Sequence, residues 1–247
     1  MRRPMADRPR FLVTAGNTRE MIDRVRDWGN VFTGNTGYAI ARALSGVGDV
    51  HLLTSNRAHR DAVRRDGGAL RASGFISHAE LARELAALTR EHQFDGVFMT
   101  AAVADYAPAG VYQIVERRPA EGGGEVWHVR DVAAEKVKSA YDAIAIVGTR
   151  TRKLVDLFRS EWGHRGLLVK FKLEVGITTE ELVRVGQQSR AASGADYLVA
   201  NTLDMVDGEK AGAFLLGDGA HEWVPRADLP QRLARLAGEW VERHPTC

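Results

Sequence analysis

The most informative part of the sequence is Val13-Thr14-Ala15-Gly16-Asn17-Thr18-Arg19-Glu20, followed by Gly29-Asn30-Val31-Phe32-Thr33-Gly34-Asn35-Thr36-Gly37-Tyr38-Ala39-Ile40-Ala41. An apolar strand at residues 11–13 leads into glycine-bearing turns, and a helix of small residues follows at 38–44. Folds of the α/β class build phosphate and nucleotide sites in this order. The many Thr, Asn and Arg side chains here favour phosphate binding. The glycines do not form a complete Gly-x-Gly-x-x-Gly, so tight turns and close helix packing explain them equally well.

The remaining pattern predicts an α/β fold: a Rossmann-like, mostly parallel sheet with helices on both faces, a flap excursion and a C-terminal hairpin. Strands are expected at 50–54, 69–74, 96–106, 143–147, 167–174 and 197–201, and the hairpin at 214–216 and 222–225. Helices are expected at 77–92, 151–162, 178–193 and 229–243, two of them opened by capping boxes at Ser77 and Thr178.

The expected organisation is a disordered leader at 1–9 and a single nucleotide-binding domain at 10–247. Residues 107–141 interrupt the α/β alternation with prolines and Gly122-Gly123-Gly124, and we interpret them as an excursion or flap with a glycine loop tip.

Composition narrows the function. The chain carries 34 Lys and Arg against 32 Asp and Glu, without a basic run that holds interleaved aromatics, which argues against nucleic acid as a partner. No apolar run approaches the ~18 residues of a membrane span, and nothing resembles a signal peptide. The single cysteine, Cys247, is the last residue, which favours a reducing cytoplasm. The eight histidines lack metal-ligand spacing, so no metal site is expected from a side-chain cluster.

Four residues stand out by position. Asp105 ends an apolar strand and is expected to face the ligand crevice, although a solvated strand end or an N-cap is also possible. Lys136 and Lys138 are two apart, so on a strand they would point together toward a polyphosphate; a solvated face is the plain alternative. Phe171 could be a base-stacking platform or part of the core.

These motifs, in this order, resemble phosphopantothenoylcysteine synthetase (phosphopantothenate–cysteine ligase) from about residue 10 to 241. The resemblance rests on 13–20, Asp23, 25–26, Asn30, Gly34, 37–41, 101–106, 135–138, 171–174 and 200–201. It implies a ligase of coenzyme A biosynthesis that activates 4′-phosphopantothenate as an acyl-nucleotide and then transfers the acyl group to cysteine. The implied co-substrate is CTP, with ATP as the alternative, together with Mg²⁺. A stand-alone form without flavin, and a homodimer whose flap reaches toward the partner's site, are expected.

The resemblance also implies residue roles. Lys136 matches the lysine that forms the acyl-nucleotide, Asn30 the asparagine that holds the activated acyl group, and Arg26 and Ala102 positions linked to its conversion with cysteine. For nucleotide binding the implied set is Gly16, Thr18, Arg19, Ala101, Asp105, Lys136, Lys138 and Phe171. For substrate binding it is Asn30, Thr33, Gly34, Gly37, Ala102 and Asn201.

Four positions depart from the usual pattern of that family. Asn17 replaces a proline, and Phe32-Thr33-Gly34-Asn35-Thr36-Gly37 replaces Ser-Ser-Gly-Lys-Met-Gly, which removes a lysine at Asn35. Ser139 stands where bacterial members carry a second lysine, a eukaryotic feature that keeps ATP open as the nucleotide. Thr202 follows Asn201 in place of aspartate.

Two other functions fit the same fold. An NAD(P)-dependent oxidoreductase also uses a strand-turn-helix cradle, but Thr54-Ser55-Asn56-Arg57 lacks the acidic residue that holds the ribose. A degenerate relative that only binds a nucleotide would account for the missing lysine at Asn35.

Overall fold

The computed structural model describes residues 8–208 and 211–244. An eight-stranded sheet in the order β13-β12-β11-β10-β6-β1-β4-β5 forms its centre. The strands are β1 (Arg10–Ala15), β4 (Asp49–Thr54), β5 (Leu70–Gly74), β6 (Gly96–Met99), β10 (Leu167–Glu174), β11 (Tyr197–Thr202), β12 (Gly212–Leu216) and β13 (His221–Pro225). The first six are parallel, and β12 and β13 add an antiparallel hairpin at one edge. The predicted α/β fold is confirmed.

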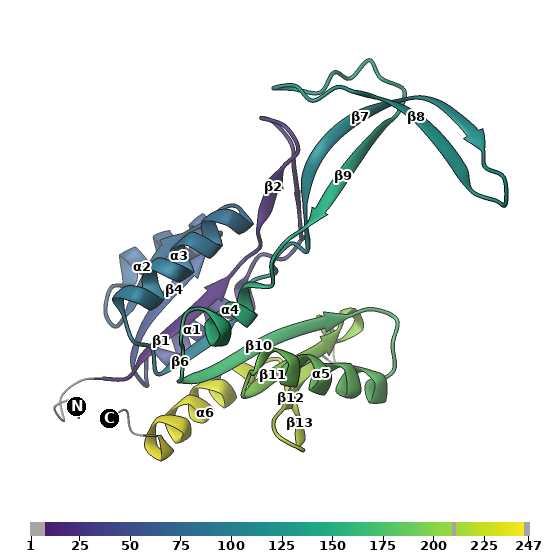
Figure 1. The fold of residues 1–247 in the computed structure, drawn as a ribbon. Coiled ribbons are helices and arrows are strands. Elements are labelled where there is room, and N and C mark those ends of the chain that lie inside the picture. Colours follow the sequence, from purple (N-terminus) through teal and green to yellow (C-terminus); the bar gives the residue numbers. More distant parts are fainter. Residues whose placement is uncertain (1–7, 209–210, 245–247) are drawn as a thin grey trace.

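Helices cover both faces of this sheet (Figure 1). One apolar cluster joins the sheet to α1 (Asn35–Leu44), α2 (Arg57–Asp66) and α6 (Leu229–Arg243). Two others join the opposite face to α3 (His78–Glu91), α4 (Leu154–Ser160) and α5 (Thr179–Ser193). Because both faces of the sheet are covered, a parallel strand such as β1 has buried side chains on both sides, and its residues 11–15 are all buried.

The predicted helix starts at Ser77 and Thr178 are confirmed. Each hydroxyl accepts a hydrogen bond from the backbone N–H three residues later, at Glu80 and Glu181, which satisfies one of the free donors of the first turn. Helix α2 was not predicted, because its buried face consists only of His59 and Val63 and gives no clear apolar period.

The excursion is a long antiparallel arm of β7 (Tyr106–Pro119), β8 (Glu125–Asp131) and β9 (Ile144–Arg150), in the order β8-β7-β9. It projects away from the sheet, as Figure 1 shows. Gly122–Gly124 form the tip between β7 and β8, as expected.

Three expectations for this region were wrong. Residues 143–147 do not return to the parallel sheet; they belong to β9, which pairs with β7 and stays partly exposed. Residues 132–143, with Lys136 and Lys138, form no strand. The expected strand 96–106 ends at Met99, because Ala101, Ala102 and Ala104 then donate backbone hydrogen bonds to Thr14 Oγ1, Gly16 O and Thr18 Oγ1.

Two short strands, β2 (Arg19–Met21) and β3 (Asp27–Gly29), extend the opening stretch toward the arm. They were not predicted, because three-residue strands are shorter than the pattern can detect. A 3₁₀ turn, η1 (Leu203–Met205), follows β11.

Candidate active site

The site lies at the carboxyl ends of β1, β6 and β10, where the direction of strand order reverses between β1 and β6. Open α/β sheets bind ligands in this crevice. Beyond the strands, residues 14–18 and 100–104 run side by side, and Thr18 N and Ala102 N donate to Ala102 O at 3.1 Å and Gly16 O at 2.9 Å. The two chain segments therefore form one rigid floor for a ligand.

The first cavity, of about 230 Å³, lies at the N-terminus of α1, and we call it the α1 cavity. Its wall includes Gly16, Thr33, Gly34, Gly37 and Asn201, all predicted site residues. The N-cap of helix α1 is Gly34, which has no side chain to cap the helix, so its first N–H groups remain available to a ligand. A helix start of this kind binds anions.

Two glycines allow the close approach that builds the α1 cavity. Gly34 adopts φ +82°, and a Cβ on it would lie 2.1 Å from Gly16 N. A Cβ on Gly37 would lie 2.1 Å from Thr100 Oγ1. Larger residues would therefore push α1 away from β1 and open the cradle.

Asn35, which stands where the related family has lysine, is held by a buried histidine. His59 Nε2 lies 3.0 Å from Asn35 Oδ1, and the His59 ring stacks on Tyr38 at 4.5 Å between centroids. Burial lowers the pKa of His59, which favours the neutral imidazole. Asn56 Nδ2 donates to Thr33 O at 3.0 Å and fixes the same loop.

The second cavity, of about 480 Å³, lies between β10 and α4, and we call it the α4 cavity. Asn30 and Asp105 are the predicted residues that line this cavity and not the α1 cavity. Asn30 Nδ2 donates to Ala102 O at 3.3 Å, and Asp105 forms an ion pair with Lys153. Phe32, Ala101, Ala102, Phe171, Lys172 and Leu173 line both cavities, which therefore meet along these residues.

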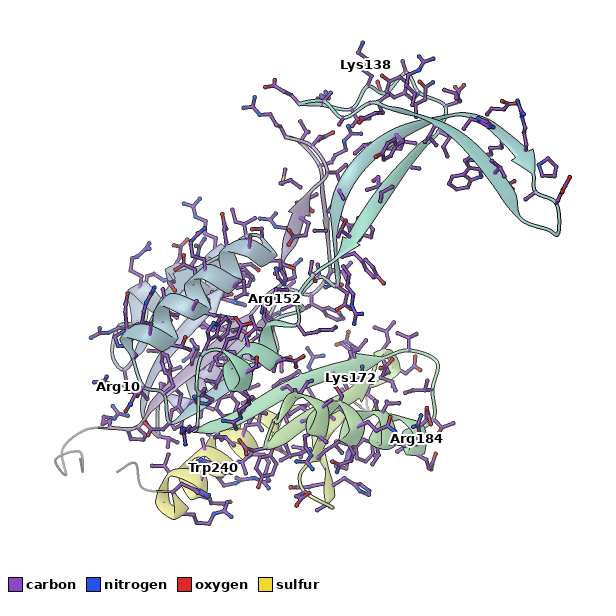
Figure 2. The ribbon with its side chains drawn as sticks, in the orientation of Figure 1. Arg10, Lys138, Arg152, Lys172, Arg184 and Trp240 are labelled. Carbon is purple, nitrogen blue, oxygen red and sulfur yellow. The ribbon has the colours of Figure 1, made fainter. Side chains whose placement is uncertain are left out.

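Lysines of β10 make the α4 cavity cationic. They were not among the site residues predicted from the sequence. Lys170 and Lys172 both line it, and Lys170 Nζ donates to Ser189 O at 3.1 Å. Burial lowers the pKa of Lys170, opposed by Asp156 and reinforced by the ammonium groups of Lys172 and Lys153. Two charged residues at period two on an otherwise buried central strand were the signal that could have revealed them. Arg152 also lines this cavity, and Figure 2 labels it together with Lys172.

Three predicted residues lie away from both cavities. Thr18 is fully buried and its hydroxyl accepts from Ala104 N at 2.8 Å, so it shapes the floor. Arg19, on β2, lies 3.6 Å from Asp27 in an exposed ion pair. Lys138 is labelled in Figure 2 at the far end of the molecule from Lys172.

Arg26 and Lys136 are likewise outside the two cavities but close to each other. Arg26 Nη2 donates to Val137 O at 2.7 Å, next to Lys136. Within one chain the predicted residues therefore form two groups: Asn30, Ala102 and Asp105 at the sheet, and Arg26, Lys136 and Lys138 beside the arm.

The described residues contain no group of three or more His, Cys, Asp and Glu that could hold a metal ion. Over residues 8–208 and 211–244, no helix has the length and apolar character needed to cross a membrane.

Comparison with known proteins identifies the fold family. Residues 6–118 match the family model described as DNA/pantothenate metabolism flavoprotein C-terminal domain. The coenzyme A biosynthesis bifunctional protein CoaBC of Thermococcus kodakarensis is 27% identical over 231 residues, which cover 93% of this chain and 50% of that protein. The CoaBC of Mycobacterium tuberculosis is 30% identical over 200 residues, covering 78% of this chain and 42% of that protein. The chain thus spans about half the length of the curated relatives it matches.

Solved structures agree on the fold. The DNA/pantothenate metabolism flavoprotein from Streptococcus pneumoniae superposes with a TM-score of 0.72 at 21% identity, over 96% of this chain and 99% of that one. A Cab2 variant in complex with phosphopantothenate-cysteine superposes with a TM-score of 0.64 at 15% identity, over 96% and 89%. Residues 6–118 are thus similar to the DNA/pantothenate metabolism flavoprotein C-terminal domain, and the fold as a whole matches that of these solved structures.

Proposed function

We propose that this protein is a phosphopantothenate–cysteine ligase. The observation that carries the proposal is the pair of cavities that meet at Ala101 and Ala102, one headed by the N-terminus of α1 and the other lined by Lys170 and Lys172. A ligase of this kind must bring two anions together, a phosphorylated acid and a nucleoside triphosphate. Two anion-binding cavities with a shared wall suit that task.

In the proposed arrangement, phosphopantothenate occupies the α1 cavity and the nucleotide occupies the α4 cavity. The free N–H groups at Gly34–Thr36 bind the phosphate of the acid, and Lys170 and Lys172 neutralise the triphosphate. Asp105 accepts from the ribose hydroxyls once Lys153 moves aside. Phe171, half-buried between the cavities, supports the base.

The first step joins a carboxylate oxygen to the α-phosphorus and breaks its bond to pyrophosphate. In the second step the free amine of cysteine attacks the acyl carbon, the nucleoside monophosphate leaves, and the amine loses one proton to water. Asn30 lies at the edge of the α4 cavity, where its amide can donate to the acyl oxygen as negative charge develops.

Mg²⁺ is proposed as the counter-ion of the triphosphate. This ion keeps several waters and binds through substrate phosphates and one or two carboxylates. Asp156, which lines the α4 cavity, is the carboxylate that could hold it there.

Within one chain Arg26 and Lys136 do not reach the two cavities, because they lie beside the arm. We propose a homodimer in which the arm of each chain brings this pair to the cavities of the other. The curated CoaBC relatives and the product-bound Cab2 variant support the assignment of activity.

The test combines purified protein with 4′-phosphopantothenate, Mg²⁺ and either CTP or ATP, with and without cysteine. Pyrophosphate release that requires phosphopantothenate is the expected result, with CTP the faster nucleotide. Acyl-nucleotide should accumulate without cysteine and disappear when cysteine is added. If neither nucleotide supports release, the proposal fails, and an NADH titration then tests the oxidoreductase alternative.

A further inference from the structure

Asp23 is a buried carboxylate that lies outside both cavities. Its side chain is fully enclosed, although it sits on the turn between the two exposed strands β2 and β3. Burying a charge is costly unless hydrogen bonds replace its hydration. The arrangement around Asp23 therefore requires an explanation.

The carboxylate accepts hydrogen bonds at both of its oxygens. Oδ1 accepts from Val25 N at 2.8 Å and Arg26 N at 2.9 Å. Oδ2 accepts from Arg26 Nε at 3.0 Å, from Arg26 Nη2, and from Val137 N at 3.1 Å. The Arg26 guanidinium holds the pKa of Asp23 well below its usual range, with the backbone donors acting in the same direction, so the group stays charged.

Val137 closes this arrangement from a distant part of the chain. Its N–H donates to Asp23, its carbonyl accepts from Arg26 Nη2 at 2.7 Å, and its side chain is 2% exposed. We call Asp23, Arg26 and Val137 the Asp23 junction. It fixes the peptide of Val137 on both sides while Lys136 and Lys138, the neighbours of Val137, remain exposed.

The junction also selects which part of Arg26 remains free. Nε and Nη2 are both engaged by Asp23 and Val137, and among the described residues Nη1 makes no hydrogen bond. The guanidinium is thus held by one edge, and its other nitrogen is left for a ligand.

We propose that Asp23 is the positioning residue that makes Arg26 and Lys136 one functional unit. This inference rests on the proposed ligase function, since it assigns both residues to the reaction. One carboxylate sets the orientation of the guanidinium and the place of the lysine-bearing segment, so the groups for the two half-reactions reach the substrates together. The residue does not touch substrate itself.

An exposed ion pair joins the same two segments and provides a matched control. Arg24 Nη1 lies 3.1 Å from Glu135 Oε1, with both side chains largely exposed. Exposed pairs of this kind contribute little to stability. Arg24→Gln therefore removes a link between the segments without disturbing the Asp23 junction.

The test compares Asp23→Asn with Arg24→Gln. An asparagine presents an N–H₂ group to the donors of Arg26 and Val137, so the junction should open. We expect trypsin to cleave after Lys136 at least about tenfold faster in Asp23→Asn than in wild type, and within about twofold of wild type in Arg24→Gln. Both half-reactions should fall by at least about tenfold in Asp23→Asn, at an unchanged urea midpoint for the core.

Asp23→Glu keeps the charge and serves where the asparagine variant does not fold. The rate of cleavage after Lys136 and the rates of both half-reactions should then lie between those of wild type and Asp23→Asn. The reason is that the longer side chain of glutamate displaces the carboxylate by one methylene group. The proposal is overturned if either folded variant leaves cleavage after Lys136 unchanged, or exposes Lys136 while both half-reactions keep wild-type rates. If wild-type protein itself makes no acyl-nucleotide, the ligase function fails, and the proteolysis comparison still shows whether Asp23 holds the segment.

Discussion

Asn30 illustrates how a single side chain is prepared by its neighbours. It follows β3 at the edge of the α4 cavity, with its amide nitrogen 3.3 Å from Ala102 O and its own carbonyl bound by Asn17 Nδ2. Asn17, which departs from the usual proline of the family, therefore supplies a hydrogen bond that a proline could not. The departure supports the site.

Replacing Asn30 with aspartate should slow the cysteine step more than activation. The carboxylate cannot donate to the acyl oxygen and repels its developing charge, so a loss of about 10²-fold is expected for acyl transfer. Quenched-flow measurement of both half-reactions should show accumulated acyl-nucleotide. Val31→Ala, at a neighbouring side chain that is 90% exposed, is the control and should leave both rates unchanged. Equal losses in both steps would contradict the role given to Asn30.

Gly34→Ala should destabilise the protein more than Gly67→Ala. Both glycines have positive φ, +82° and +62°, so alanine costs about 1–2 kcal/mol at each. Only Gly34 also meets backbone, 2.1 Å from Gly16 N, whereas Gly67 has nothing within 4 Å. Overpacking adds about 1–3 kcal/mol at Gly34. Urea unfolding of both variants measures the difference, and equal losses would show that the Gly16–Gly34 contact is not required.

Among the elements, the arm is the one whose surface is unusual. Val115, Val126, Trp127, Val129 and Val147 are exposed by 46–50% along β7, β8 and β9. Trp127 has partners within its own chain: its indole N–H donates to Glu125, and Arg117 lies over its ring. The four valines are apolar side chains exposed to water, and contact with a second copy of the chain would cover them.

Light scattering should therefore give a mass of twice 27.1 kDa for the wild-type chain. Val129→Asp should weaken the dimer by at least about tenfold, because the interface would then bury an unpaired charge. Val175→Asp, at a 65% exposed valine after β10 and off the arm, is the matched control and should leave the mass unchanged. A monomer that turns over normally would refute the role proposed for the arm.

The fold as a whole buries His59 and partly buries His51 and His164. His51, His59 and His164 each have a pKa lowered chiefly by burial. Their ordinary value is 6.5, so below that pH the unfolded chain binds protons that the folded protein resists. The free energy of unfolding should then be highest above pH 6.5 and fall as pH decreases toward the lowered folded values.

Urea midpoints at pH 7.5 and pH 5.5 test this, and the midpoint should be lower at pH 5.5. His59→Gln should reduce the difference, because one of the buried imidazoles is removed. His128→Gln, at an exposed side chain of the arm, should leave it unchanged. A midpoint that rises on acidification would contradict the assignment, because carboxylates with a lowered pKa, such as Asp23, also lose stability as the pH falls.

The sequence by itself determined the elements whose pattern is local. The strand at 167–174 and the helices capped by the hydroxyls of Ser77 and Thr178 were predicted correctly. Each depends on residues within a few positions of it in the chain. Gly16, Gly34 and Gly37 line the α1 cavity, and Asn30 and Asp105 line the α4 cavity; their roles there stay predictions.

Only the tertiary structure decided the contacts between distant segments. Residues 144–150 alternate like any strand, and only their pairing with β7 assigns them to the arm. Lys136 lacks the strand geometry expected for it, and its place depends on Val137 meeting Asp23, more than one hundred positions away in the chain. Hydrogen bonds across such a separation leave no local periodicity. The glycine-bearing turns near Gly16 and Gly34 could therefore be predicted from the sequence. The contact between Asp23 and Val137 could be identified only from the tertiary structure.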